Sequence, residues 1–220
     1  MGDIFSNYDV LGAFWWTIKL SFFGGLGALV LGTIAAIMRV SPVAVMRFIG
    51  SAYVNIFRNT PLTLLMVLSV LGVTYILGVT LADDINQNAL RWAMVVLAVY
   101  HGAFVCEALR SGVNTVPAGQ AEAARAVGLT FGQSMREVIL PQAFRGSIAP
   151  LGSVLIALIK NTTVAAVIVQ AEAAGLMQRI IEFEGGSFLI FAIFALGFVV
   201  LTMPLGILFT SMSRRLAVKR

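Results

Sequence analysis

The chain has 220 residues, of which 59% are hydrophobic and only 11% are charged, and its mean hydropathy is +0.94. So little polar surface excludes a water-soluble globule and predicts a protein whose solvent is mostly lipid. The net charge of +5 would suit nucleic acid or a membrane surface, so its meaning depends on where the basic residues fall along the chain.

Five apolar segments are long enough to cross a bilayer, which takes about 20 helical residues. They lack the strict alternation of membrane strands, and a helix bonds its own backbone polar groups in hydrocarbon. We therefore predict one all-α integral membrane domain over residues 1–220. Its spans are expected near 18–38, 61–82, 90–111, 147–171 and 187–212, with a polar connection over about 112–146.

The first span carries Gly24, Ala28 and Gly32 at four-residue spacing. Small residues at this spacing let another helix backbone approach closely, so we predict a packing face; a glycine-lined pore is the alternative. No basic run or cleavage site accompanies this span, which predicts that it is its own insertion signal. The following segment, residues 41–61, mixes basic and apolar residues and is expected to run along the membrane interface as a helix before Pro61 opens the second span.

The third span contains His101, Cys106, Glu107 and Arg110. A single cysteine can form no intrachain disulfide, so Cys106 is predicted to be a packed core thiol. Glu107 and Arg110 lie three residues apart on one helix face, and we expect them to pair with each other or with the polar connection. For His101 taken alone, a structural packing role is the favoured interpretation.

The polar connection is predicted to form two short helices. Pro117 can begin the first, and Gly128 can take the left-handed conformation that ends it. Thr130 is then expected to cap a second helix that ends before Pro141, because proline lacks the N–H that would continue it. The result would be a compact knob; an ordinary solvated connection is the alternative.

The fourth span contains Lys160, followed by Asn161, Thr162 and Thr163. A lysine in mid-span is costly unless it meets a partner or a water-filled cavity. It could bind a ligand carboxylate, satisfy helix-end carbonyls or pair with an internal carboxylate. The three residues after it can supply neutral hydrogen bonds, and His101 is expected at comparable depth.

The orientation follows from the basic residues, because Lys and Arg are retained on the cytoplasmic side of short loops. With the N-terminus outside and the C-terminus in the cytoplasm, eleven of the fifteen basic residues lie at or beyond the inner boundary. The positive charge is therefore a topology signal, and a nucleic-acid partner is excluded. The inner basic residues are Arg39, Arg47, Arg58, Arg110, Arg125, Arg136, Arg145, Arg214, Arg215, Lys219 and Arg220, and the acidic residues expected outside are Asp3, Asp9, Asp83, Asp84, Glu172, Glu182 and Glu184.

The stretch from Gly119 to Ala143 resembles the EAA loop of importer-type ABC transporter permeases. In that pattern a Glu-Ala-Ala triplet is followed by a glycine and later by Leu-Pro, which here are Glu122, Ala123, Ala124, Gly128, Leu140 and Pro141. RNTPLT at 58–63, LRSGVNTV at 109–116, LIALIKNTTVA at 155–165 and the terminal RLAVK narrow the resemblance to the histidine, glutamine and glutamate branch. They look most like the permeases of actinobacterial glutamate uptake systems.

This resemblance implies the type I ABC importer permease fold in a bacterial cytoplasmic membrane. The EAA loop would be the ATPase-coupling element, comprising Glu122, Ala123, Ala124, Arg125, Gly128, Leu140 and Pro141. Ala123 and Ala124 would let a partner groove close tightly over it. The implied partners are two copies of an ABC ATPase, a solute-binding protein and a second permease, which is a related chain or a copy of this one.

The implied substrate is a polar amino acid, with glutamate first and glutamine or another polar amino acid second. Lys160, Asn161, Thr162, Thr163 and His101 are the candidate substrate-binding residues. The chain has no GxxxxGK[ST] string, no metal-ligand spacing and no catalytic constellation, so we expect no cofactor here and place ATP and magnesium on the ATPase. A stand-alone carrier or channel is the rival class, although no internal repeat is visible.

Overall fold

In the computed structural model, which describes residues 7–169, 171–186 and 188–216, every regular element is a helix. Four helical runs in these ranges are long and apolar enough to cross a membrane: Val10–Val40 (α2), Ile85–Asn114 (α5), Phe131–Val167 and Phe188–Leu216 (α10). A fifth span is possible if Ala44–Asn59 (α3) and Leu62–Ile76, which bend by 100° at their junction, count as one. Asp3, Lys219 and Arg220, which contribute to the predicted orientation, lie outside the described residues.

The core of the bundle is the contact between α2 and α5, where glycines let the two backbones come close. A Cβ atom built at Gly24 would lie 3.0 Å from the Leu97 Cβ, and one at Gly32 would lie 2.5 Å from the Val105 Cβ. Ala28, between these glycines, is fully buried. The predicted packing face of the first span is thus confirmed, and its partner is α5.

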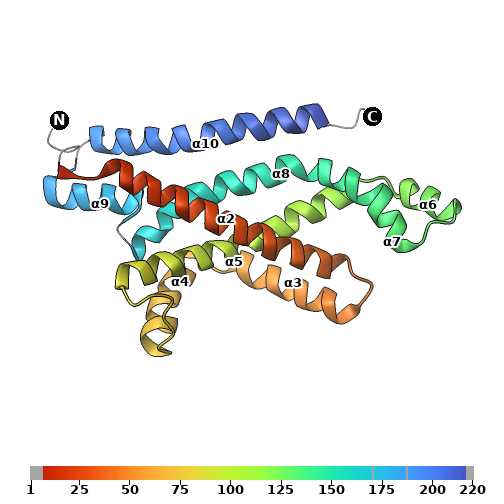
Figure 1. Cartoon of the computed structure of the whole chain (residues 1–220), viewed down its shortest axis with the longest axis horizontal. Helices are drawn as coiled ribbons and strands as arrows, with labels where there is room; N and C mark the ends of the chain where they lie inside the picture. The colour runs from red at the N-terminus through yellow and green to blue at the C-terminus, as the bar shows by residue number, and fades with distance from the viewer. Residues whose placement is uncertain (1–6, 170, 187, 217–220) are drawn as a thin grey trace.

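The remaining long helices extend this core along one axis (Figure 1). Leu140–Asn161 (α8) packs on α5, and α10 runs along α8, where Gly152 leaves room for the Phe209 ring. Ala173–Glu184 (α9) lies at the end of the molecule where the chain begins. Ala118–Ala126 (α6) and Phe131–Gln133 (α7) lie at the opposite end, so the two groups of short helices mark opposite poles.

The second predicted span is shorter than expected. It is helical only through Leu62–Val67 (α4) and the π-helix Leu68–Ile76 (η1). Gly78 then has φ +70°, a left-handed conformation that glycine adopts readily. The chain leaves the helix here, well before residue 82.

The prediction that the helix after Thr130 ends before Pro141 is wrong. The helix continues from α7 through the π-helix Ser134–Ile139 (η2) into α8, with Pro141 in the first turn of α8. The Leu140 N–H donates to the Met135 carbonyl, five residues back. We attribute the continuity to this wider π turn, which accommodates the proline ring and its missing donor without a break.

Candidate functional site

A polar contact joins α5 and α8 inside the bundle. The His101 Nδ1 lies 3.1 Å from the Leu97 carbonyl oxygen, and its Nε2 lies 3.1 Å from the Asn161 Nδ2. A carbonyl can only accept, so Nδ1–H donates to Leu97 and Nε2 accepts from the Asn161 amide. His101 is 2% exposed, and this arrangement holds it as a neutral ring in one tautomer.

Asn161 and His101 also line a pocket of about 340 Å³ between the two helices. Its other walls combine aromatic and small side chains: Tyr100, Phe104, Ser153, Val154 and Ala157. The Tyr100 and His101 rings pack edge to face at 5.1 Å between centroids. The pocket therefore offers aromatic surface, an amide and a hydroxyl together, which is the mixture that small polar ligands use.

Lys160 precedes Asn161 in the last turn of α8, and its side chain is exposed. None of the salt bridges in the described part of the chain involves it. Lys160 lies inside the apolar run Phe131–Val167, as expected for the fourth span, at the point where α8 tightens into the 3₁₀-helix Thr162–Val167 (η3). A cation in the last turn of a helix is favoured by the helix dipole.

Thr162 and Thr163 are not brought into the pocket. The Thr162 hydroxyl donates to the Ile159 carbonyl at 2.7 Å, and the Thr163 hydroxyl donates to the Lys160 carbonyl at 2.8 Å. Both side chains thus satisfy the carbonyls where α8 ends. Of the five predicted substrate residues, the structure brings His101 and Asn161 together and leaves Lys160 beside them.

A second polar cluster gathers around Glu107 at the α6 end of the bundle. The predicted pair is confirmed, with the Arg110 Nη2 2.8 Å from Glu107 Oε2. Arg39 of α2 also pairs with this carboxylate, and Arg58 of α3 lies 3.8 Å from it. Sequence spacing could not identify these two partners, although both had been assigned to the same side of the membrane as Arg110.

α6 ends in a Schellman motif. The Gly128 N–H donates to the Arg125 carbonyl at 3.0 Å, and the Leu129 N–H donates to the Ala124 carbonyl at 3.1 Å. Gly128 has φ +85°, which confirms the left-handed end predicted for this helix. Thr130 then forms a capping box with Gln133, which confirms the predicted cap.

The exposed surface of α6 carries Glu122, Ala123 and Arg125. Ala124 is only 4% exposed, so the expectation that both alanines face a partner is wrong for Ala124. α6 packs against η2, and a buried methyl on this short helix stabilises that contact. Leu140 and Pro141 are exposed but belong to the start of α8.

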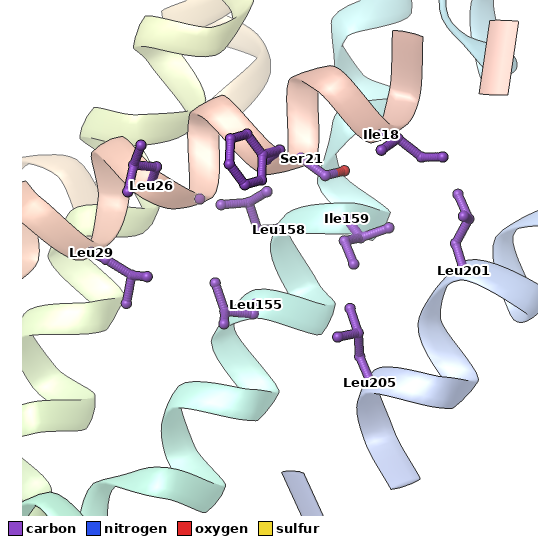
Figure 2. A pocket seen from close by; sticks show the side chains of 11 residues that line it. Ile18, Ser21, Leu26, Leu29, Leu155, Leu158, Ile159, Leu201 and Leu205 are labelled. Atoms are coloured by element: carbon purple, nitrogen blue, oxygen red, sulfur yellow. The ribbon is translucent and has the colours of Figure 1, made fainter. Parts of the chain in front are cut away.

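An apolar groove runs between α2, α8 and α10, with a volume of about 470 Å³ (Figure 2). Leu155, Leu158 and Leu205 project into it, and Ser21 is its one polar side chain. Such a lining suits lipid chains or another apolar helix and does not suit a zwitterionic solute. Within the described residues, no group of three His, Cys, Asp or Glu side chains could hold a metal ion.

Known proteins match the chain over most of its length. Residues 28–219 match the model of the family described as binding-protein-dependent transport system inner membrane component. The glutamate transport system permease protein GluC of Corynebacterium glutamicum is 49% identical over 218 residues, covering 96% of each chain. The probable glutamine ABC transporter permease protein GlnM of Bacillus subtilis is 32% identical, covering 97% of this chain and 96% of that protein. A crystal structure of an amino acid ABC transporter with histidines superposes with a TM-score of 0.84 at 28% identity, covering 94% of this chain and 93% of that one.

Proposed function

Because the chain belongs to the binding-protein-dependent transport system inner membrane component family, we propose that it carries glutamate through the membrane as one permease subunit of an ATP-driven importer. The assignment of glutamate as substrate rests on the 49% identity to a glutamate permease over nearly the full length. Glutamine is the second candidate, because a probable glutamine permease is 32% identical over a similar length. The chain is a permease subunit rather than an enzyme, since the ATPase in this family is a separate subunit.

The proposed topology has five spans, an external N-terminus and a cytoplasmic C-terminus. α9 and the N-terminal end of α2 would then face outside, where a solute-binding protein delivers the substrate. α6 would project into the cytoplasm and dock on the ATPase, of which two copies bind ATP and magnesium. The exposed Glu122, Ala123 and Arg125 of α6 supply one small and two charged side chains for that contact. A second permease, a related chain or a copy of this one, would complete the pathway.

The pocket beside His101 is the proposed stretch of the pathway within this subunit. Asn161 and His101 hold each other in place, and an exposed ammonium at Lys160 is available nearby. A substrate α-carboxylate would meet Lys160, and its polar groups would meet Asn161 and Ser153. Thr162 and Thr163 would shape the helix end that presents Lys160.

Uptake by the purified complex in proteoliposomes tests this proposal. The complex contains this chain, its second permease, the ATPase and the binding protein, and radiolabelled glutamate or glutamine is supplied outside with ATP inside. We expect saturable glutamate uptake that needs both ATP and the binding protein, and weaker glutamine uptake. Faster glutamine uptake would overturn the substrate assignment, and uptake by this chain without the ATPase would place it among stand-alone carriers.

A further inference from the structure

A pocket of about 280 Å³ at the α6 end of the bundle has no part in the proposed pathway. It lies between α2, α5 and the start of α8, and its walls include Ile37, Val40, Leu109 and Phe144. The His101 pocket opens between α5 and α8 alone, and none of its lining residues is shared with this one. Apart from Thr33, Arg110 and Ser147 the lining is apolar, which suits a hydrocarbon chain.

The pocket follows the axis of a membrane helix. Thr33, Ile37 and Val40 of α2 contribute to it at the spacing of one helix face. From Thr33 to Val40 the helix rises about 10 Å, which is most of the depth of one hydrocarbon leaflet, about 15 Å. Farther along the same helix, Ile18, Phe22 and Leu29 line the groove of Figure 2, so this face of α2 is hollowed over much of its length.

A cluster of positive charge lies at the pocket. Arg110 is itself a lining residue, and it shares Glu107 with Arg39 and Arg58. Three guanidinium groups against one carboxylate leave a formal charge of about +2 in this cluster, by the fixed ionisation of arginine. The Arg110 and Arg58 side chains are 40% and 44% exposed, so donors remain free for a further anion. Arginine binds phosphate oxygens through paired hydrogen bonds.

We propose that this pocket binds an anionic phospholipid of the adjacent leaflet, with one acyl chain beside Ile37 and Phe144 and its phosphate on Arg110. Basic pockets between membrane helices suit anionic headgroups. Here Arg110 belongs both to the charged cluster and to the wall of the mostly apolar pocket. Only the identification of this leaflet as the cytoplasmic one rests on the proposed function. The bound lipid would also touch Leu140 at the start of α8 and Met135 of η2, the segment on which α6 packs.

Native mass spectrometry of the intact complex, released from nanodiscs, measures the bound lipid. The discs contain phosphatidylcholine alone or phosphatidylcholine with phosphatidylglycerol. We expect phosphatidylglycerol to remain bound preferentially. Arg110→Gln should weaken its retention about tenfold, which is the loss expected for one charge-assisted hydrogen bond. Ile37→Trp should reduce it similarly by filling the pocket.

Two matched variants separate this site from general effects. Arg145→Gln removes an exposed arginine that does not line the pocket, and Ile34→Trp adds the same bulk to an exposed position of α2 outside it. Both should retain phosphatidylglycerol as the parent does, and soluble glycerol phosphate should not compete. Equal retention of the two lipids, or unchanged retention in both Arg110→Gln and Ile37→Trp, overturns the site. The site is also overturned if the complex retains no phosphatidylglycerol, which is the result expected if the second permease covers the pocket. Lipid retention is measured without transport, so its outcome is independent of the substrate assignment.

Discussion

Lys160 is a charged residue at the end of α8, next to the residue that contacts His101. Its ammonium is exposed at the last turn of α8, and its own carbonyl accepts the Thr163 hydroxyl. Asn161, the next residue, is held by His101 on α5. The side chain that would meet a substrate carboxylate thus stands on a backbone fixed by two neighbouring hydrogen bonds.

Replacing Lys160 with methionine keeps most of the side-chain length and removes the charge. A charge-assisted hydrogen bond is worth about 1.5 to 3 kcal/mol, so we expect glutamate uptake at saturating loaded binding protein to fall roughly tenfold. The complex should still assemble and bind nucleotide. Lys19→Met is the control, because Lys19 lies over the Trp16 ring, 3.8 Å from its centroid, and lines none of the pockets described here. Wild-type uptake by Lys160→Met would show that the residue is structural.

Glu172 is a buried carboxyl between the helical run Phe131–Val167 and α10. Its oxygens accept from the Gly175 N–H at 2.6 Å and from the Ala174 N–H at 2.8 Å. Burial nevertheless raises the pKa of this carboxyl from 4.5 to about 7, although those two donors oppose the shift. The folded chain therefore binds this proton more tightly than the unfolded chain does.

The resulting stabilisation should be complete below about pH 4.5 and should be lost as the pH rises through about 7. We expect Glu172→Gln to reduce the difference in unfolding free energy between pH 5 and pH 7.5 by on the order of 2 kcal/mol. Thermal unfolding in detergent at the two pH values measures this. Glu182→Gln, at an exposed position on α9, should leave the difference intact. An unchanged pH dependence in Glu172→Gln would mean that the buried group titrates normally.

At the scale of elements, the α2–α5 contact should tolerate no added methyl group at Gly32. A Cβ atom there would lie 2.5 Å from the Val105 Cβ and 2.6 Å from the Gly102 carbonyl oxygen. The backbone atom cannot move aside without displacing α5, so Gly32→Ala should destabilise the chain by about 1 to 3 kcal/mol. Gly25→Ala is the matched control, because its Cβ would meet only Leu155 and Leu158, at 3.7 and 4.0 Å. Equal melting temperatures for the two variants would contradict this close packing.

A second prediction about glycine concerns Gly128 at the end of α6. Gly128 and Gly119 both have open space where a Cβ would lie, but only Gly128 has a positive φ. A β-branched residue is strained in that conformation, so Gly128→Val should disturb the end of α6 and lower substrate-stimulated ATP hydrolysis severalfold. Gly119→Val, in the helical part of α6, should have a much smaller effect. Normal coupling in Gly128→Val would remove α6 from the coupling role.

Local features of these elements could be predicted because each depends on a few neighbouring residues. The left-handed Gly128, the Thr130 cap and the Glu107–Arg110 pair follow from spacing along one helix or turn. Contacts across the bundle could not be predicted this way. Arg39 meets Glu107 across 68 residues, and Asn161 meets His101 across 60, distances over which no sequence period applies. At Pro141 a local rule failed: proline was expected to end the helix, but the helix continues through the π turn of η2 into α8.

The whole molecule is divided between two poles (Figure 1). At one pole α9 packs on the N-terminal part of α2, and its surface exposes Gln178, Arg179 and Glu182. At the other pole α6 exposes Glu122 and Arg125. The long helices between them are apolar enough to cross a membrane. The proposed importer would need separate external and cytoplasmic docking surfaces, and we propose that the two poles provide them.

Photo-cross-linking from the two poles tests the proposed orientation of the chain and the docking of α6 on the ATPase. In a Cys106→Ser background, a benzophenone probe is attached to a single cysteine at Ala123 or at Gln178, both exposed positions, in the assembled complex. We expect the probe at Ala123 to cross-link the ATPase, and of these two partners the probe at Gln178 to cross-link only the solute-binding protein. Cross-linking of the ATPase from Gln178, or of the binding protein from Ala123, would contradict both the orientation and the coupling role of α6.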